Sequence, residues 1–205
     1  MFIVFEGVDG AGKTTQLNSL VQWLRQRQHD VVTCKDPGST ALGEQLRAIL
    51  LGKHETPISM RAEMMLFTTA RTQLVDEIVR PALDRGQTVV LDRYLFSTVV
   101  YQGYAGHLDA EDIRKVNHVA TAGLMPDLTF ILDLPLETAL QRLGSSLDRM
   151  ESRGPEYLKR VREGFQQEAS RWPTGVELVD ADRSSEAIAR EIETLTQQYL
   201  DRRGA

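Results

Sequence analysis

Residues 7–15 have the composition and spacing of a loop that binds phosphate. They read Gly-Val-Asp-Gly-Ala-Gly-Lys-Thr-Thr, which satisfies the P-loop pattern G-x-x-x-x-G-K-[ST]. Glycines let the main chain curl so that its N–H groups point inward, and a following helix adds its positive N-terminal end. Lys13 can then reach the β and γ phosphates of a nucleotide, and Thr14 can hold magnesium. An ordinary exposed lysine at a helix N-terminus would be electrostatically unfavourable, so the pattern indicates a nucleotide-phosphate site.

A second group of charged residues follows a later apolar run. Asp92 and Arg93 come directly after residues 88–91, which read as a buried strand. A carboxylate there can order the magnesium shell, and a guanidinium can clamp phosphoryl oxygens through two hydrogen bonds. An isolated Asp-Arg pair is more often a surface salt bridge, but its place at a strand end near the P-loop strand favours a functional role.

The elements that must position these residues alternate along the chain. Predicted strands span residues 2–5, 31–34, 88–91, 129–132 and 176–179, and predicted helices span 14–28, 43–51, 59–84, 110–122, 136–142, 155–171 and 184–200. This alternation predicts right-handed crossovers around a five-stranded parallel sheet with helices on both faces, a doubly wound α/β fold. Ligands of such folds gather at the carboxyl ends of the strands, where the P-loop and the Asp92-Arg93 pair both fall.

Length and composition narrow the class of protein. The 205 residues suit one domain, expected to span 1–205. With 24 basic and 29 acidic side chains the net charge is −5, which provides no global positive field for nucleic acid. The apolar runs are only a few residues long, whereas a membrane span needs about 20. Cys34 is the only cysteine, so a cytoplasmic protein without an internal disulfide is expected.

A P-loop by itself does not separate kinases from GTPases or motor ATPases. The chain has no Asn-Lys-x-Asp sequence for guanine recognition, and it is too short for the appended domains of most P-loop motors. A kinase for a small substrate fits best. The residues expected to bind the ATP phosphates are Gly7, Val8, Asp9, Gly10, Ala11, Gly12, Lys13, Thr14 and Thr15.

Further motifs carry a resemblance to one family. They are Glu6 before the P-loop, Asp36-Pro37-Gly38, Arg47, the helix of residues 63–71, Asp92-Arg93-Tyr94, the Ser97-Thr98-x-x-Tyr101-Gln102-Gly103 segment, Pro126-Asp127-Leu128 and Asp148-Arg149-Met150-Glu151. In this order they resemble the thymidylate kinase family, from Phe2 to about Asp182. The resemblance implies a P-loop NTPase fold with a short lid at about residues 142–154. It also implies transfer of the γ-phosphate of ATP to dTMP for dTTP synthesis, with Mg²⁺ as cofactor, in a homodimer.

The resemblance implies a site for the thymine base. Phe67 and Arg71 share one helix face at i and i+4, where Phe67 would stack on the base and Arg71 would hydrogen-bond its carbonyl edge. From the residues alone, this role and the simpler alternative, a core phenylalanine beside a surface arginine, are about equally favoured. Thr98 and Gln102, on a short helix after the third strand, follow the family pattern for residues near the base, although they could also be helix caps or exposed.

The same resemblance assigns residues to the sugar and the monophosphate. Asp9 would accept a hydrogen bond from the deoxyribose 3′-hydroxyl, and Tyr101 would crowd out a ribose 2′-hydroxyl. Arg47 and Arg93 would bracket the dianionic phosphate, although Arg47 alone could be a solvated helix residue. Asp36 and Pro37 belong to a loop under that phosphate, where the family more often has Glu-Pro-Gly.

One expected catalytic group is harder to place. Some thymidylate kinases carry a catalytic arginine in the P-loop, but this P-loop reads Asp9-Gly10-Ala11 at that point. The lid must then supply it, and Arg149 is the first choice, joining Lys13, Asp92 and Arg93 in the predicted catalytic set. Arg142 and Arg153 are possible substitutes. Two alternatives stay open, a kinase for another deoxynucleoside monophosphate and a non-catalytic nucleotide-binding module.

Overall fold

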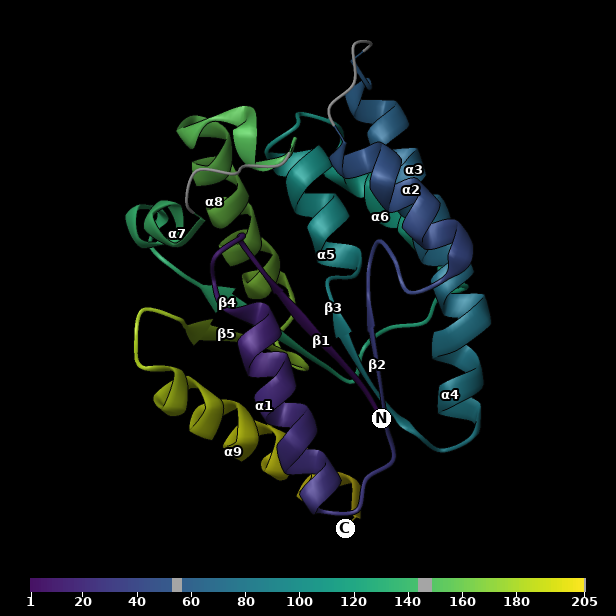
Figure 1. Cartoon of the computed structure of the whole chain (residues 1–205), viewed down its shortest axis with the longest axis vertical. Coiled ribbons are helices and arrows are strands. Elements are labelled where there is room, and N and C mark those ends of the chain that lie inside the picture. Colours follow the sequence, from purple (N-terminus) through teal and green to yellow (C-terminus); the bar gives the residue numbers. More distant parts are fainter. Residues whose placement is uncertain (53–56, 144–148, 205) are drawn as a thin grey trace.

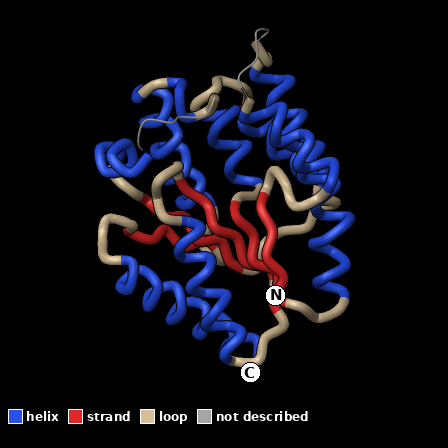
Figure 2. Tube along the Cα trace, viewed as in Figure 1, coloured by secondary structure: helices blue, strands red, loops and turns tan. Residues whose placement is uncertain are grey.

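A computed structural model describes residues 1–52, 57–143 and 149–204 of the chain. In the described residues, five parallel strands form a sheet in the order β2-β3-β1-β4-β5 (Figures 1 and 2). The strands are β1 (Phe2–Gly7), β2 (Val31–Lys35), β3 (Thr88–Asp92), β4 (Leu128–Asp133) and β5 (Val176–Asp180). Each contains one predicted strand, so the predicted α/β class and the five-stranded sheet are confirmed.

Helices connect and follow the strands. They are α1 (Lys13–Gln26), α2 (Ala41–Leu51), α3 (Met60–Leu74), α4 (Arg80–Asp84), α5 (Leu95–Thr98), α6 (Ala110–Ala120), α7 (Leu136–Leu143), α8 (Pro155–Arg171) and α9 (Ser185–Gly204), with wider π-helical turns η1 (Val75–Val79) and η2 (Val99–Tyr104) and a 3₁₀ turn η3 (Glu151–Arg153). The predicted helix 59–84 is continuous but widens in η1. Pro81 lies just beyond η1, and because proline lacks an N–H and its ring crowds the preceding turn, a π turn relieves the clash.

Helices cover both faces of the sheet. The chain moves from β1 towards one edge to form β2 and later from β4 towards the opposite edge to form β5. Crossovers between parallel strands are almost always right-handed, and by that rule α1 and α8 lie on opposite faces of the sheet. After β5 the chain returns to the first face, where α9 packs beside α1 in front of the sheet in Figure 1.

The core lies between the sheet and these helices. All six residues of β1 are buried, and Phe5 meets Phe130 of β4 with ring centroids 5.5 Å apart. Cys34 on β2 is buried as well, and burial raises the pKa of its thiol to about 12. The described segments contain no helix both long and apolar enough to cross a membrane.

The predicted lid is only partly described. Residues 142–143 end α7, and residues 149–154 form the turn and η3 that lead into α8. Residues 144–148, including Asp148, lie outside the described residues.

Candidate active site

The P-loop joins the buried strand β1 to the N-terminus of α1. Gly7 has φ +131°, and a Cβ atom there would lie 2.5 Å from the carbonyl oxygen of Leu132, so only glycine fits. Gly12, with φ +90°, precedes α1 and provides no side-chain cap for the helix. In the part of the chain that the structure describes, no side chain caps the N-terminus of α1, which leaves its first N–H groups available to an anion.

Lys13 lies inside the P-loop with its side chain 7% exposed. Its Nζ donates to the carbonyl oxygens of Gly7, at 3.1 Å, and Val8, at 2.9 Å. Burial, reinforced by the charge of Arg93, lowers the pKa of Lys13, while Asp9 opposes that shift. The ammonium group is thus already desolvated and held over the loop where phosphates would lie.

Asp92, at the end of β3, lies beside the first turn of α1. The hydroxyl of Thr14 donates to Asp92 Oδ2 at 3.4 Å, and the other carboxylate oxygen, Oδ1, is buried without a hydrogen-bond partner in the described residues. A buried carboxylate oxygen without a donor is costly unless a ligand satisfies it. Magnesium prefers oxygen ligands and is commonly held by one or two protein groups together with nucleotide phosphates, so this pair fits the ion.

Arg93 takes an uncommon backbone conformation, with φ +67°. A non-glycine residue in this region costs about 1–3 kcal/mol and persists only where the surroundings impose it. Glu6 imposes it here, because its buried carboxylate accepts the N–H of Tyr94 at 2.8 Å and both the N–H and the hydroxyl of Ser97. The turn directs the Arg93 guanidinium back to the P-loop, where it donates to the Gly7 carbonyl at 3.1 Å.

Asp9 connects the P-loop to the next part of the site. Its carboxylate pairs with Arg93 and accepts a 3.1 Å hydrogen bond from the hydroxyl of Tyr101. Burial alone would raise the pKa of Asp9, but Arg93 and Lys13 bring it well below its ordinary value. Asp9 is therefore ionised at neutral pH and available as an acceptor.

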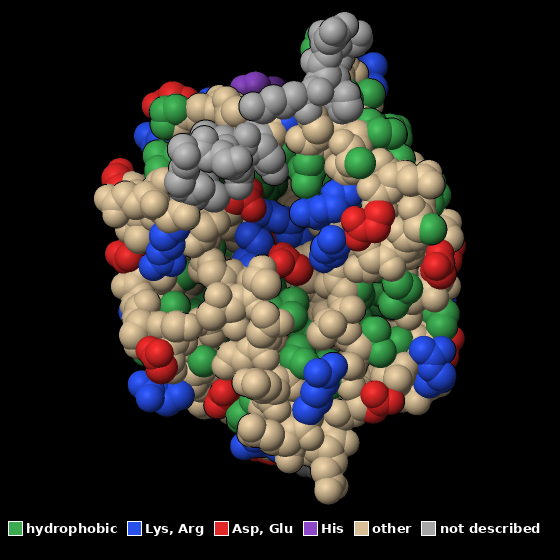
Figure 3. All heavy atoms as spheres, in the orientation of Figure 1, with side chains coloured by type: hydrophobic (Ala, Val, Ile, Leu, Met, Phe, Trp, Pro, Cys, Tyr) green, Lys and Arg blue, Asp and Glu red, His purple; other side chains and the backbone are tan. Residues whose placement is uncertain are grey.

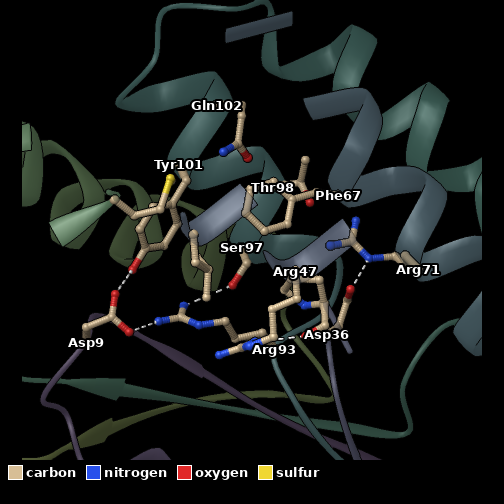
Figure 4. Close-up of a pocket in the computed structure, with 13 residues that line it drawn as sticks. Asp9, Asp36, Arg47, Phe67, Arg71, Arg93, Ser97, Thr98, Tyr101 and Gln102 are labelled. Carbon is tan, nitrogen blue, oxygen red and sulfur yellow. Dashed lines mark hydrogen bonds and ion pairs between the residues drawn. The ribbon is translucent and has the colours of Figure 1, made fainter. Parts of the chain in front are cut away.

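A cavity of about 520 Å³ opens beside Asp9 (Figure 4). It is lined by Asp9, Asp36, Pro37, Arg47, Leu51, Phe67, Arg71, Arg93, Ser97, Thr98, Tyr101, Gln102 and Met150. All ten residues that the sequence predicts for dTMP line this one cavity. They come from the P-loop, the β2 loop, α2, α3 and the segment after β3, so the fold brings together residues far apart in the sequence. Their individual contacts with a nucleotide stay predictions.

A more open cavity of about 1140 Å³ lies over the P-loop. It shares Asp9, Asp36, Arg47 and Arg93 with the first cavity. Figure 3 shows lysine and arginine side chains gathered around the hollow at the centre of this face, with acidic groups between them. A chain with net charge −5 therefore concentrates positive charge locally.

Arg71 is almost fully buried and donates hydrogen bonds to one carboxylate and one side-chain amide. Its Nε donates to Asp36 Oδ2 at 2.6 Å, and its Nη1 donates to Asn117 Oδ1 at 2.6 Å. These two hydrogen bonds fix Arg71 at the wall of the cavity opposite Asp9 in Figure 4. Burial raises the pKa of Asp36, and the charge of Arg71 opposes that rise.

We expect Arg71→Met to lower the free energy of unfolding by about 3–5 kcal/mol at pH 7, because it leaves a buried carboxylate unpaired. Without Arg71 the pKa of Asp36 rises further, so the deficit should shrink at acidic pH, where the carboxyl is protonated. Urea unfolding of the wild type and the variant, at pH 7 and at an acidic pH, measures this difference in the free energy of unfolding. Asp36→Asn combined with Arg71→Met should recover part of the loss, and a deficit independent of pH would contradict the assignment.

The three lid arginines take different places. Arg149 donates from Nε to the carbonyl of Leu50 at 2.7 Å and pairs through Nη2 with Glu63 at 2.5 Å. Arg153 pairs with the same Glu63. Arg142, at the end of α7, lines the cavity over the P-loop and donates to the Gly10 carbonyl at 3.3 Å. The catalytic role of Arg149 stays a prediction, and Arg142 is the lid arginine beside the P-loop in this structure.

Sequence reasoning gave no role to several residues of this region. Ser97 lines the cavity and bridges Arg93 and Glu6, and Leu51 and Met150 provide apolar wall. Glu63 is fully buried under Gln102. A charged residue in the first turn of an amphipathic helix ordinarily indicates an exposed position, so only its place in the family-like motif could have drawn attention to Glu63.

Known proteins similar to this chain agree in their names. A sequence model of thymidylate kinase matches residues 5–192. A thymidylate kinase of an Exiguobacterium species is 42% identical and covers 100% of this chain and 97% of its own length. That of Desulfovibrio desulfuricans is 40% identical over 100% of this chain and 98% of its own. The crystal structure of thymidylate kinase from Ehrlichia chaffeensis superposes with a TM-score of 0.78 at 29% identity, covering 96% of this chain and 98% of that one.

Proposed function

The chain belongs to the thymidylate kinase family, and we propose how its residues carry out the reaction of that family, the ATP-dependent phosphorylation of dTMP to dTDP. One observation supports the assignment of roles above all. The cavity lined by the ten predicted dTMP residues shares four of them with the cavity over the P-loop. A monophosphate between these cavities would face the terminal phosphate of a nucleotide held by the P-loop, as direct transfer requires.

The proposed transfer is in line, from the γ-phosphoryl group to an oxygen of the dTMP phosphate. Lys13 neutralises charge on the ATP phosphates, and Arg93, with Arg47 beside it, holds the acceptor phosphate. The second pKa of a phosphate is about 6, so the acceptor oxygen is already ionised near neutral pH. The reaction therefore needs positioning and charge neutralisation rather than a strong general base.

We propose that Thr14 and Asp92 hold Mg²⁺ when ATP is bound. Their separation of 3.4 Å and the unpartnered Asp92 Oδ1 support this. When bound, the ion would neutralise and orient phosphate oxygens. Asp92 would at the same time keep the Thr14 hydroxyl at the mouth of the P-loop.

Selection of the sugar rests on the Asp9–Tyr101 pair in this proposal. Tyr101 is buried, and its hydroxyl is fixed by Asp9, so the ring has little freedom to make room for a 2′-hydroxyl. Asp9 keeps acceptor capacity for a 3′-hydroxyl, since a carboxylate offers about four lone-pair sites. Phe67 would stack on the base, with Arg71 on its carbonyl edge and Thr98, whose hydroxyl has no partner in the described residues, nearby.

We assign the catalytic lid arginine to Arg142, with Arg149 and Arg153 as the alternatives. Arg142 lines the cavity over the P-loop, whereas the other two share one buried carboxylate. A cation beside the P-loop can meet the charge that spreads over the transferring group without first breaking a buried ion pair.

A homodimer and a cytoplasmic location complete the proposal. Exposed apolar side chains on the adjacent helices α2, α3 and α6, Leu42, Met65 and Val119 among them, support association with a second copy. A single buried thiol is compatible with a reducing compartment.

A coupled assay of ADP release tests the substrate. We expect efficient turnover with dTMP and much lower kcat/KM with dCMP, dGMP and AMP, because the cavity offers a cation to a carbonyl edge and a fixed tyrosine to the sugar. dUMP, which lacks only a methyl group, should lose about 10–200-fold or less. A clear preference for another monophosphate would overturn the assignment, and tight ATP binding without dTDP formation would favour a non-catalytic module.

A further inference from the structure

Glu63, in the first turn of α3, has a fully buried carboxylate and is not itself among the residues that line the cavity. It accepts a 2.7 Å hydrogen bond from Nε2 of Gln102 and pairs with the guanidinium groups of Arg149 and Arg153. Gln102 does line the cavity. One buried carboxylate thus connects two arginines of the predicted lid to a side chain of the proposed base site.

The contact with Glu63 decides which way the Gln102 amide faces. A carboxylate accepts hydrogen bonds and donates none, so the amide nitrogen must be the atom turned towards it. Reversing the amide would bring two acceptor oxygens together in a buried place, which is unfavourable. The oxygen of Gln102 is therefore held away from Glu63. Figure 4 shows this amide directed into the space between Tyr101, Thr98 and Phe67.

The two walls of the base site then present a definite pattern. Arg71 is donor only, while the fixed amide of Gln102 presents its oxygen as an acceptor. Thymine and uracil carry a carbonyl at position 4 and an N–H at position 3, which match a donor and an acceptor. Cytosine reverses both, with an amino group at position 4 and an acceptor nitrogen at position 3.

We propose that Glu63 is a positioning residue that fixes the orientation of the Gln102 amide. This inference rests on the proposed dTMP site, and by it Glu63 sets the preference for a 4-oxo over a 4-amino pyrimidine. Arg149 and Arg153 keep the Glu63 carboxylate paired, since an unpaired buried charge would be costly. Neither Glu63 nor the two arginines need touch the nucleotide for this purpose.

Glu63→Gln tests the proposal, because a neutral amide can pair with either orientation of Gln102. The ratio of kcat/KM for dTMP to that for dCMP should fall about 10-fold or more, mainly through KM. The ratio of dTMP to dUMP should stay unchanged, since both bases present the same edge. Glu77→Gln, an exposed position on η1, is the matched control and should change neither ratio. A general loosening of the site would lower both ratios together and would contradict the proposal.

A double-mutant cycle with Gln102→Leu separates action through Gln102 from other effects, even if Glu63→Gln loses stability. In the Gln102→Leu background, Glu63→Gln should no longer change the dTMP to dCMP ratio. An equal change in both backgrounds would show that Glu63 acts by another route. Wild-type turnover of dTMP is measured alongside. If the wild type forms no dTDP, the proposed function fails, and this outcome is distinguishable from a failure of the present inference.

Discussion

Replacing Lys13 by methionine should lower turnover of dTMP by about 10²–10³-fold, the loss typical for removal of one preorganised donor from a site of developing charge. The ammonium is buried in the P-loop and donates to Gly7 and Val8, so the loop already fixes its position. Methionine has a similar volume and flexibility, which keeps the packing and removes the charge. Initial rates at saturating ATP and dTMP measure the effect.

Two results would separate loss of chemistry from loss of the fold. Lys159→Met removes an exposed lysine from α8 and should leave turnover unchanged. Thermal unfolding of Lys13→Met should show a stable protein, because burial lowers the pKa of Lys13 and its charge is desolvated at a cost in the wild type. Undiminished turnover in a folded Lys13→Met protein would remove the basis of the phosphate-site assignment.

The fold could be predicted because its signals are local. Five short buried runs separated by amphipathic stretches leave few arrangements other than a parallel sheet with right-handed crossovers. The carboxyl-end rule then placed the P-loop, the loop after β2 and the residues after β3 at one edge of the sheet, as observed. The η1 turn before Pro81 was not predicted, because a helix-period pattern says nothing about a one-residue widening of the helix.

The sequence predicted which residues line the site better than it predicted how those residues contact one another. The ten residues predicted to bind dTMP were identified by motif, and all of them line one cavity. No motif shows that Arg71 donates hydrogen bonds to Asp36 and Asn117, or that Glu63 accepts a hydrogen bond from Gln102. Such partners come from helices and loops far apart in the sequence, and periodicity gives only the face on which a residue lies. The same limit applies to the lid, where three arginines are alike in sequence and differ only in what they contact.

Arg142→Ala should lower the rate of phosphoryl transfer by about 10³-fold or more, the range of an arginine that meets transition-state charge, and should change the Kd for dTMP little. Arg142 donates to the P-loop carbonyl of Gly10, and within residues 1–52, 57–143 and 149–204 it has no ion pair with a buried carboxylate that must first be broken. Single-turnover transfer of labelled phosphate gives the rate, and calorimetric titration gives the Kd. Arg160→Ala, on α8 and outside both cavities, is the control for loss of an arginine.

Arg149→Ala and Arg153→Ala should behave differently from Arg142→Ala. Each leaves one guanidinium on Glu63, so transfer should slow much less, and the visible effect should be a weaker preference for dTMP over dCMP. If Arg149→Ala instead lost about 10³-fold in the transfer rate with Kd unchanged, Arg149 would have to leave Glu63 when both substrates bind. In that case the Glu63 pair would be a resting position for the catalytic cation. The comparison of the three variants therefore decides between a lid arginine that stays beside the P-loop and one released from a buried carboxylate.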